Sequence, residues 1–351
     1  MPGLSAPIAL DGSHLEGGGA LVRTALTMAA LTQQPVRIHN VRGNAPTPGI
    51  TTEDLTIARA LALATGAETS GARGDHELHF APARRPSGLN ESIYPPEDEN
   101  DEHANALVVL HSLLPVMART GVFSKITCRG ETFGHGVLSY DYFLNVTLAA
   151  HRRMGLYAYP ELTLAGFGRG SRGEVRLEIE PSSLHGVDWP IRGELISAGA
   201  AVATAELSPA VACRGVGHLE RLAQHAGVPL HVESFDVRSR QPGAFVTVFA
   251  EFEQGFGGAT AMGRRGVRME MLAQNAFDSF LEWFKTPSTT DGFLSDQILI
   301  TAAMAESEST FTVSKLNQRF LTTVWVIKQF LPIRITIRGQ EGEPGLVTIR
   351  R

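Results

Sequence analysis

Glycines and an arginine lie together in one short N-terminal stretch, LDGSHLEGGGALVRTAL, which runs from Leu10 to Leu26. Three consecutive glycines, Gly17, Gly18 and Gly19, would let the backbone approach a ligand closely. The helix expected just after them would direct its free amide groups and the positive end of its dipole back at the loop. Arg23, one turn into that helix, carries a forked guanidinium that suits a phosphate. These residue types at this spacing favour a loop that holds a phosphate.

The same stretch departs from the usual phosphate-loop patterns. Glu16 stands where such a loop would carry a lysine, and a carboxylate suits a divalent metal or a ribose hydroxyl better than a bare phosphate. Asp11 would end a strand and could cap a tight strand–helix turn that binds nothing. From these residues alone, a ligand-binding loop and a structural turn both remain open.

A second glycine-rich segment, GFGRGSRG, carries two arginines, Arg169 and Arg172. Arginines flanked by glycines can form a phosphate-binding patch, because the backbone does not obstruct the ligand. Two solvated arginines in an ordinary hairpin would give the same pattern. Both interpretations remain open.

Composition and charge narrow the class of protein. The chain has 351 residues, of which 43% are hydrophobic and 19% charged, and its net charge is −5. There is therefore no overall basic field, and any nucleic-acid site must be a local patch. Cys128 and Cys213 lie far apart and form no zinc pattern, which favours a reduced, cytoplasmic setting. We expect no signal peptide, because Asp11 comes early, and no membrane span, because no apolar run is long enough.

Weak repeats organise the chain around these residues. A helix-spaced segment followed by a period-two strand occurs three times and ends each time in Arg-Gly, at Arg42, Arg129 and Arg338. A second helix and a strand pair alternate with the first pattern. These features favour an α/β (α+β) fold in which a βαβαββ unit is used about three times, although repeats this weak also arise by chance. From about Gly186 to Gly266 the repeating order of helices and strands changes, and the segments that flank the predicted helix and strands are rich in turn residues. We expect residues 1–185 and 267–351 to form a large domain, with 186–266 as a smaller inserted α/β domain.

The opening stretch, continued by VRGNAPTPGI, resembles the start of the RNA 3'-terminal phosphate cyclase family, whose members read close to LDG-x-x-x-EGGG-x-x-x-R. The likeness continues through LVVLHSLLP, RGET, GFGRGSRGEV and FLSDQILI to FTVSKLNQRFLTTVWVIKQFLPIRITI, and so covers nearly the whole chain. It implies three βαβαββ units with an inserted domain. It also implies ATP-dependent conversion of an RNA 3'-phosphate to a 2',3'-cyclic phosphate with Mg²⁺ or Mn²⁺. In that reaction a histidine attacks the α-phosphorus and holds AMP, which passes to the RNA end and is displaced by the 2'-hydroxyl.

Several family positions are present in this sequence. Glu16, the glycine run and Arg23 match the first loop, and Arg42 with Pro48-Gly49 matches the second motif. Asp296 and Gln297 match an Asp-Gln pair of the family pattern. The resemblance implies nucleotide or phosphate contacts for these residues, with Asp296 and Glu16 as candidate metal ligands.

Other family positions carry different residues. Ala45 and Thr47 stand where the family has an arginine and a lysine, Glu53-Asp54 replaces a Gln-His pair, and His111 replaces a glutamine. The alignment places Arg319 at the position of the nucleophilic histidine. The lost basic residues would have neutralised RNA phosphates.

Arginine at the nucleophile's position conflicts with the family's chemistry. Imidazole offers an unprotonated nitrogen near neutral pH, whereas a guanidinium stays protonated and cannot attack phosphorus. Arg319 can bind a phosphate or stabilise a transferring group. No histidine follows Gln254 in the sequence, so a shifted alignment does not supply one. His14, His111 and His135 are the candidate substitutes, and each is also explained as a polar contact.

Three functions remain open at this point. The first is binding of a nucleotide or RNA 3'-phosphate end, with catalysis by a non-standard route if the chain is active. The second is a catalytically silent paralogue that acts by binding RNA or as a scaffold. The third is a small-molecule transferase on the same fold, which the net negative charge and the lost basic residues favour. A homo-oligomer is compatible with the sequence.

Overall fold

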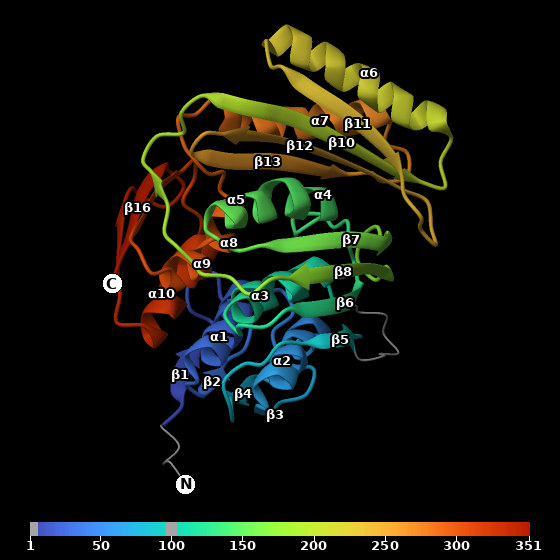
Figure 1. The fold of residues 1–351 in the computed structure, drawn as a ribbon. Helices are drawn as coiled ribbons and strands as arrows, with labels where there is room; N and C mark the ends of the chain where they lie inside the picture. Colours follow the sequence, from blue (N-terminus) through green and yellow to red (C-terminus); the bar gives the residue numbers. More distant parts are fainter. Residues whose placement is uncertain (1–5, 96–103) are drawn as a thin grey trace.

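Three units with one topology build most of the molecule (Figure 1). The computed structural model describes residues 6–95 and 104–351. The first unit contains β1 (Ile8–Asp11), α1 (Gly19–Thr32), β2 (Val36–His39), α2 (Thr52–Thr65), β3 (Glu68–Ser70) and β4 (Glu77–Ala81). The second contains β5 (Asn90–Ile93), α3 (Ala106–Ala118), β6 (Ser124–Gly130), the helical run α4 (Tyr140–Tyr142), η1 (Phe143–Thr147) and α5 (Leu148–Arg153), then β7 (Ala158–Leu164) and β8 (Gly173–Ile179).

The third unit is split in the sequence. It contains β9 (Asp188–Trp189), α8 (Leu294–Gln297), α9 (Leu299–Met304), β14 (Ser309–Val313), α10 (Gln318–Phe330), β15 (Arg334–Arg338) and β16 (Gly345–Arg350). The segment between β9 and α8 forms β10 (Leu195–Ala205), α6 (Pro209–Ala226), β11 (Leu230–Asp236), β12 (Gly243–Phe252), β13 (Gly255–Met262) and α7 (Met269–Phe284). The insertion therefore lies in the first strand–helix connection of the third unit.

Sheet pairing repeats from unit to unit. The strand orders are β1-β2-β4-β3, β5-β6-β8-β7 and β9-β14-β16-β15. In each sheet the first two strands are parallel and the remaining pairings are antiparallel. The expected α/β fold of three βαβαββ units is confirmed.

The C-terminal sequence repeat has a different place in its unit from the other two. The segments ending at Arg42 and Arg129 contain the first helix and second strand of their units, α1–β2 and α3–β6, whereas the segment ending at Arg338 contains the second helix and third strand, α10–β15. The expectation of three equivalent segments was wrong. A helix followed by an alternating strand describes both steps of the unit, so periodicity alone does not separate them.

The insertion has its own sheet and its own core. Its strands are ordered β11-β10-β12-β13, and α6 and α7 pack on them. Buried side chains of α7, from Met269 to Trp283, belong to this core. The domain boundaries at 186 and 266 stay a prediction, and the packing of α7 favours a second boundary after Trp283.

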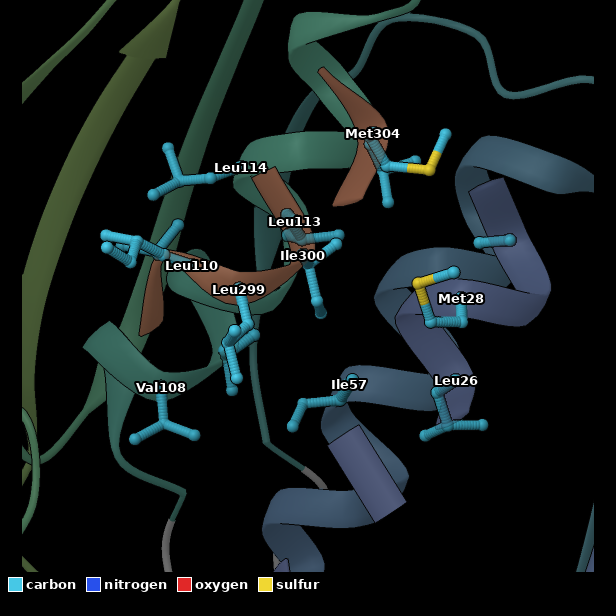
Figure 2. Close-up of a cluster of buried hydrophobic side chains, with 14 of the residues drawn as sticks. Leu26, Met28, Ile57, Val108, Leu110, Leu113, Leu114, Leu299, Ile300 and Met304 are labelled. Atoms are coloured by element: carbon cyan, nitrogen blue, oxygen red, sulfur yellow. The ribbon is translucent and has the colours of Figure 1, made fainter. Parts of the chain in front are cut away.

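Helices from all three units share the main hydrophobic core. Figure 2 shows side chains of α1, α2, α3 and α9 meeting there; they include Leu26, Met28, Ile57, Leu113 and Ile300, all of which are buried. Helix α10 packs along α1. This contact brings residues almost 300 positions apart in the sequence to one place. No helix in the described part of the chain has the length and apolar character needed to cross a bilayer.

Candidate functional site

The loop between β1 and α1 is held in shape by short polar contacts. Asp11 Oδ1 accepts hydrogen bonds from the backbone N–H and hydroxyl of Ser13, at 3.0 and 2.7 Å. These bonds, together with one from Asn40, lower the pKa of Asp11 to about 2. Asn44 Nδ2 donates to the carbonyls of Ser13 and Leu15 at 2.6 and 3.0 Å. The loop is therefore ordered by its own residues and by the segment after β2.

Gly17 and Glu16 connect this loop to its surroundings. Gly17 has a φ of +56°, and a Cβ there would lie 2.7 Å from Asn44 Nδ2, so only glycine fits. Glu16 Oε2 accepts from Gly18 N at 3.0 Å, and Glu16 N donates to Thr322 Oγ1 of α10 at 3.1 Å. The loop is thereby joined to the third unit.

The side chain of Arg42 lies against Gly19, at the start of α1. Its Nε and Nη2 donate to the two oxygens of Asp54, at 2.7 and 3.3 Å, and the Asp54 side chain is 1% exposed. A Cβ on Gly19 would lie 2.7 Å from Arg42 Nη2. Asp54 also forms the capping box of α2 with Thr51. Arg42 is thus committed to a buried ion pair at the base of the loop.

A cavity of about 70 Å³ lies where the helices of the three units meet. Its charged and larger polar lining residues are Arg23 of α1, Glu53 of α2, His111 of α3, Asp296 and Gln297 of α8, and Arg319 of α10. The hydroxyl side chains of Thr24, Thr27, Ser112 and Thr323 also line it. The structure therefore brings together five residues chosen from the sequence, Arg23, His111, Asp296, Gln297 and Arg319. It adds Glu53, which the sequence indicated only as half of a replaced pair.

Both cavity arginines pair with one oxygen of Asp296. Arg319 Nη2 lies 3.0 Å and Arg23 Nη2 lies 3.4 Å from Asp296 Oδ2. Arg319 also lies over the ring of Phe293, with 5.0 Å between its Cζ and the ring centroid. Asp296 Oδ1 and Arg319 Nε are buried and have no hydrogen-bond partner among the described residues. Burial and the neighbouring Arg319 lower the pKa of Arg23.

Glu53 is a second carboxyl group in the lining of the cavity. Its Oε2 accepts from Asn105 N at 3.0 Å, and Asn105 is the N-cap of α3. Burial raises the pKa of Glu53, which favours the neutral acid. Asp296 is therefore the carboxylate that pairs directly with both guanidiniums.

His111 is the histidine of this cavity. Its Nε2 lies 3.2 Å from the carbonyl oxygen of Gln297; since a carbonyl only accepts, Nε2 carries the proton. Burial, His151 and Arg23 lower the pKa of His111 well below its usual value, so the ring is neutral. Gln297 is in turn held by Thr147 Oγ1 and Phe293 O, both at 2.7 Å.

The other sequence candidates lie elsewhere. His14 stacks on Trp325 of α10, with ring centroids 4.1 Å apart, and does not line the cavity. Arg169 is exposed in the turn between β7 and β8. Arg172 lines a separate groove. The roles assigned to these residues stay predictions.

ATP and a divalent metal also stay predictions. The described residues contain no group of three or more His, Cys, Asp or Glu side chains placed to hold a metal ion. A magnesium ion bound with a phosphate needs only one or two carboxylates, and Asp296 Oδ1 is a free oxygen of that kind among the described residues. Asp296 is therefore the residue present that fits such an ion.

Comparisons with known proteins agree with this architecture. A family model described as RNA 3'-terminal phosphate cyclase matches residues 14–337. The RNA 3'-terminal phosphate cyclase of Thermococcus onnurineus is 34% identical over 97% of this chain and 98% of its own length. That of Methylococcus capsulatus is 31% identical over 97% and 95%. The alignment with a solved enolpyruvyl transferase, NikO of Streptomyces tendae, covers 98% of this chain and 48% of that protein, at 12% identity and a TM-score of 0.39. By its sequence from end to end, this chain belongs to the RNA 3'-terminal phosphate cyclase family.

Proposed function

We propose that this chain binds a phosphate-bearing RNA 3' end, or the phosphate of a nucleotide, between Arg23 and Arg319, without forming a histidine–AMP intermediate. The observation that supports this is the pairing of both guanidiniums with Asp296 Oδ2. Asp296 orients the two forks, and each guanidinium keeps further N–H donors for a ligand.

The size of the cavity favours one phosphate over a whole nucleotide. A buried water needs about 10–15 Å³ of such space, so about 70 Å³ takes about five water-sized atoms, the heavy-atom count of one phosphate group. Small-molecule sites usually have about 300–1,000 Å³. A terminal phosphate therefore enters the cavity while the sugar and base stay outside it.

The nitrogen needed for a covalent intermediate is missing at Arg319. Its guanidinium stays protonated, and Asp296 at 3.0 Å stabilises the charged form. His111 donates its Nε2 proton to the Gln297 carbonyl, so Nδ1 is its unprotonated nitrogen and the one that the labelling experiment tests. His14 stacks on Trp325. The residues present support binding and charge stabilisation of a phosphate rather than attack on ATP.

Glu16 and Asp296 supply the remaining polar groups of the site. A divalent cation would be held by Asp296 Oδ1 and by phosphate oxygens, and it would neutralise phosphate charge. Glu16 favours the charged form of Arg23 and of Arg319, and its place in the loop suits a ribose hydroxyl.

Binding of matched RNA oligonucleotides tests the proposal. We expect the wild-type chain to prefer a 3'-phosphate over a 3'-hydroxyl by about tenfold or more, because a charge-assisted hydrogen bond contributes about 1.5–3 kcal/mol. Arg319→Gln should remove most of this preference. Lys328→Gln, which removes one exposed charge from the same helix, should leave it unchanged. Equal affinity of the wild-type chain for both ends would overturn the proposal.

Labelled ATP tests the second half of the proposal. Incubation with α-labelled ATP and Mg²⁺ or Mn²⁺, followed by a denaturing gel, should leave the protein unlabelled. A label that disappears in His111→Gln would show that His111 replaces the missing nucleophile. If free phosphate esters compete equally well with RNA ends, a small-molecule transferase becomes the better assignment.

A further inference from the structure

We propose that a second groove, lined by Arg129, Arg172, Arg238 and Arg240, binds the RNA strand upstream of the end held in the cavity. This rests on the proposed binding of an RNA end. The groove has a volume of about 580 Å³ and is also lined by Tyr94 and Glu174. A smaller hollow of about 260 Å³ shares Arg172 and Arg240 with it.

The groove lies at a recurrent position of the fold. Tyr94 follows β5 and Arg129 is near the end of β6, two parallel strands whose carboxyl ends lie side by side. The β1–α1 loop follows the equivalent strand of the first unit. In open α/β sheets, ligands bind outside the carboxyl ends of parallel strands.

The insertion completes the groove from the other side. Arg238 and Arg240 lie in the β11–β12 connection, which Figure 1 shows reaching from the inserted sheet toward the second unit. Its backbone is bonded to that unit: Ala165 N donates to Arg238 O at 2.7 Å, and Ser239 Oγ donates to Ala165 O at 3.0 Å. Both arginine side chains are therefore held facing the second unit.

Two of the arginines that line the groove carry a positive charge that no described carboxylate offsets. Of the four arginines that line it, Arg172 has an interaction of its own, and Arg129 donates from Nε to Glu174 Oε2 at 2.8 Å. That bond lowers the pKa of Glu174, so it is a full negative charge already committed to Arg129. Arg238 and Arg240 have no ion-pair partner in the part of the chain that the structure describes. On a chain with a net charge of −5, this is a local patch that a polyanion would find.

An aromatic ring favours a nucleic acid over an acidic peptide. The guanidinium of Arg129 lies 4.3 Å from the ring centroid of Tyr94, and Tyr94 is 49% exposed. Grooves for single-stranded nucleic acid combine arginines that follow the backbone with aromatic rings on which bases stack. An acidic peptide needs the charges but not the ring.

The groove and the cavity are joined through a short segment. Glu131, next to Gly130 of the groove, accepts from Asn105 Nδ2 at 3.4 Å. Asn105 N donates at 3.0 Å to Glu53, which lines the cavity. Leu138, another cavity residue, accepts from Asn105 Nδ2 at 3.0 Å. Asn105 therefore connects a residue beside the groove to two residues that line the cavity.

RNA length separates the two sites in an experiment. The full chain is titrated with a 3'-phosphorylated dinucleotide and with a 3'-phosphorylated single strand of about ten nucleotides. Arg238→Gln/Arg240→Gln should weaken binding of the longer strand about tenfold or more. It should also reduce the slope of log K against log salt by about 1.4, since each phosphate contact contributes about 0.7. The dinucleotide affinity should not change.

Control variants make each outcome decisive. Arg334→Gln/Arg338→Gln removes two exposed charges from β15 of the third unit and should change neither affinity. Tyr94→Leu should weaken binding of the longer strand about tenfold without altering the slope of log K against log salt. The proposal that the groove binds RNA would be overturned if both double variants lost the same affinity for the longer strand. It would also be overturned if Arg238→Gln/Arg240→Gln lowered the affinity for the dinucleotide. Displacement of the longer strand by an oligoglutamate of equal charge would overturn it as well.

The same titrations distinguish this inference from the proposed function. If the longer strand depends on Arg238 and Arg240 but shows no preference for a 3'-phosphate, the cavity proposal fails and the groove remains a strand site. If the 3'-phosphate preference is intact while both arginine pairs behave alike, the groove fails and the cavity proposal stands.

Discussion

Arg319 and Asp296 form the contact that defines the cavity, with Arg319 Nη2 3.0 Å from Asp296 Oδ2 and side-chain exposures of 29% and 3%. Arg23 approaches the same oxygen at 3.4 Å. Asp296 therefore separates two like charges that would otherwise repel each other, and a phosphate would serve the same purpose.

Asp296→Asn should make stability depend on an added anion. Removing one partner of a buried ion pair costs about 3–5 kcal/mol, and here it leaves two guanidiniums without a counter-charge. Inorganic phosphate should then raise the melting temperature of the variant more than that of the wild-type chain, as measured by calorimetry across a phosphate titration. Equal shifts in the two proteins would show that the arginines do not form an anion site.

Asp54→Asn should destabilise the chain strongly. Asp54 holds both Arg42 and the capping box of α2, so its loss leaves a buried guanidinium unpaired, at a cost of about 3–5 kcal/mol. Urea unfolding measures this change. Arg37→Gln, which breaks the exposed Arg37–Glu77 ion pair, is the control and should leave the midpoint unchanged. Similar losses of stability in both variants would contradict a stabilising role for the buried Arg42–Asp54 ion pair.

Gly17→Ala should weaken RNA-end binding more than Gly74→Ala does. Gly17 needs a positive φ, and its Cβ would collide with Asn44, which holds the loop. Gly74 also has a positive φ of +83°, but a Cβ there meets nothing within 4 Å. Gly74→Ala therefore reports backbone strain of about 1 kcal/mol alone. A larger loss of RNA-end affinity in Gly17→Ala than in Gly74→Ala is expected; identical losses would argue against an ordered loop.

Asp141→Asn should stabilise the chain in a pH-dependent way. Burial raises the pKa of Asp141 to about 7, and its Oδ2 has no hydrogen-bond partner among the described residues. Between its unfolded pKa near 3.8 and about 7, the folded state holds a proton that the unfolded state releases, so stability falls as pH rises. The advantage of the variant should grow from pH 4 to 7 and level off at up to about 4 kcal/mol. A constant advantage at pH 4 and pH 8 would contradict this.

Periodicity suggested the repeated units, because each helix and strand buries a face that its own sequence displays, and the family resemblance implied three of them with an insertion. It did not place the last repeat within its unit, since α10–β15 and α1–β2 look alike locally. The role of α7 was also hidden, because an amphipathic helix does not reveal which sheet will cover it.

For the candidate site, too, some features follow from the sequence and others only from the tertiary structure. The sequence by itself determined the glycine loop, the absence of a late histidine and the residue types that can hold a phosphate. Only the tertiary structure decided that Arg23, Asp296 and Arg319 meet, that Arg42 is taken by Asp54, and that Arg238 and Arg240 face Arg129 across a groove. A chemical type is a property of one residue, whereas a distance between residues almost 300 positions apart is set by how α1, α8 and α10 pack.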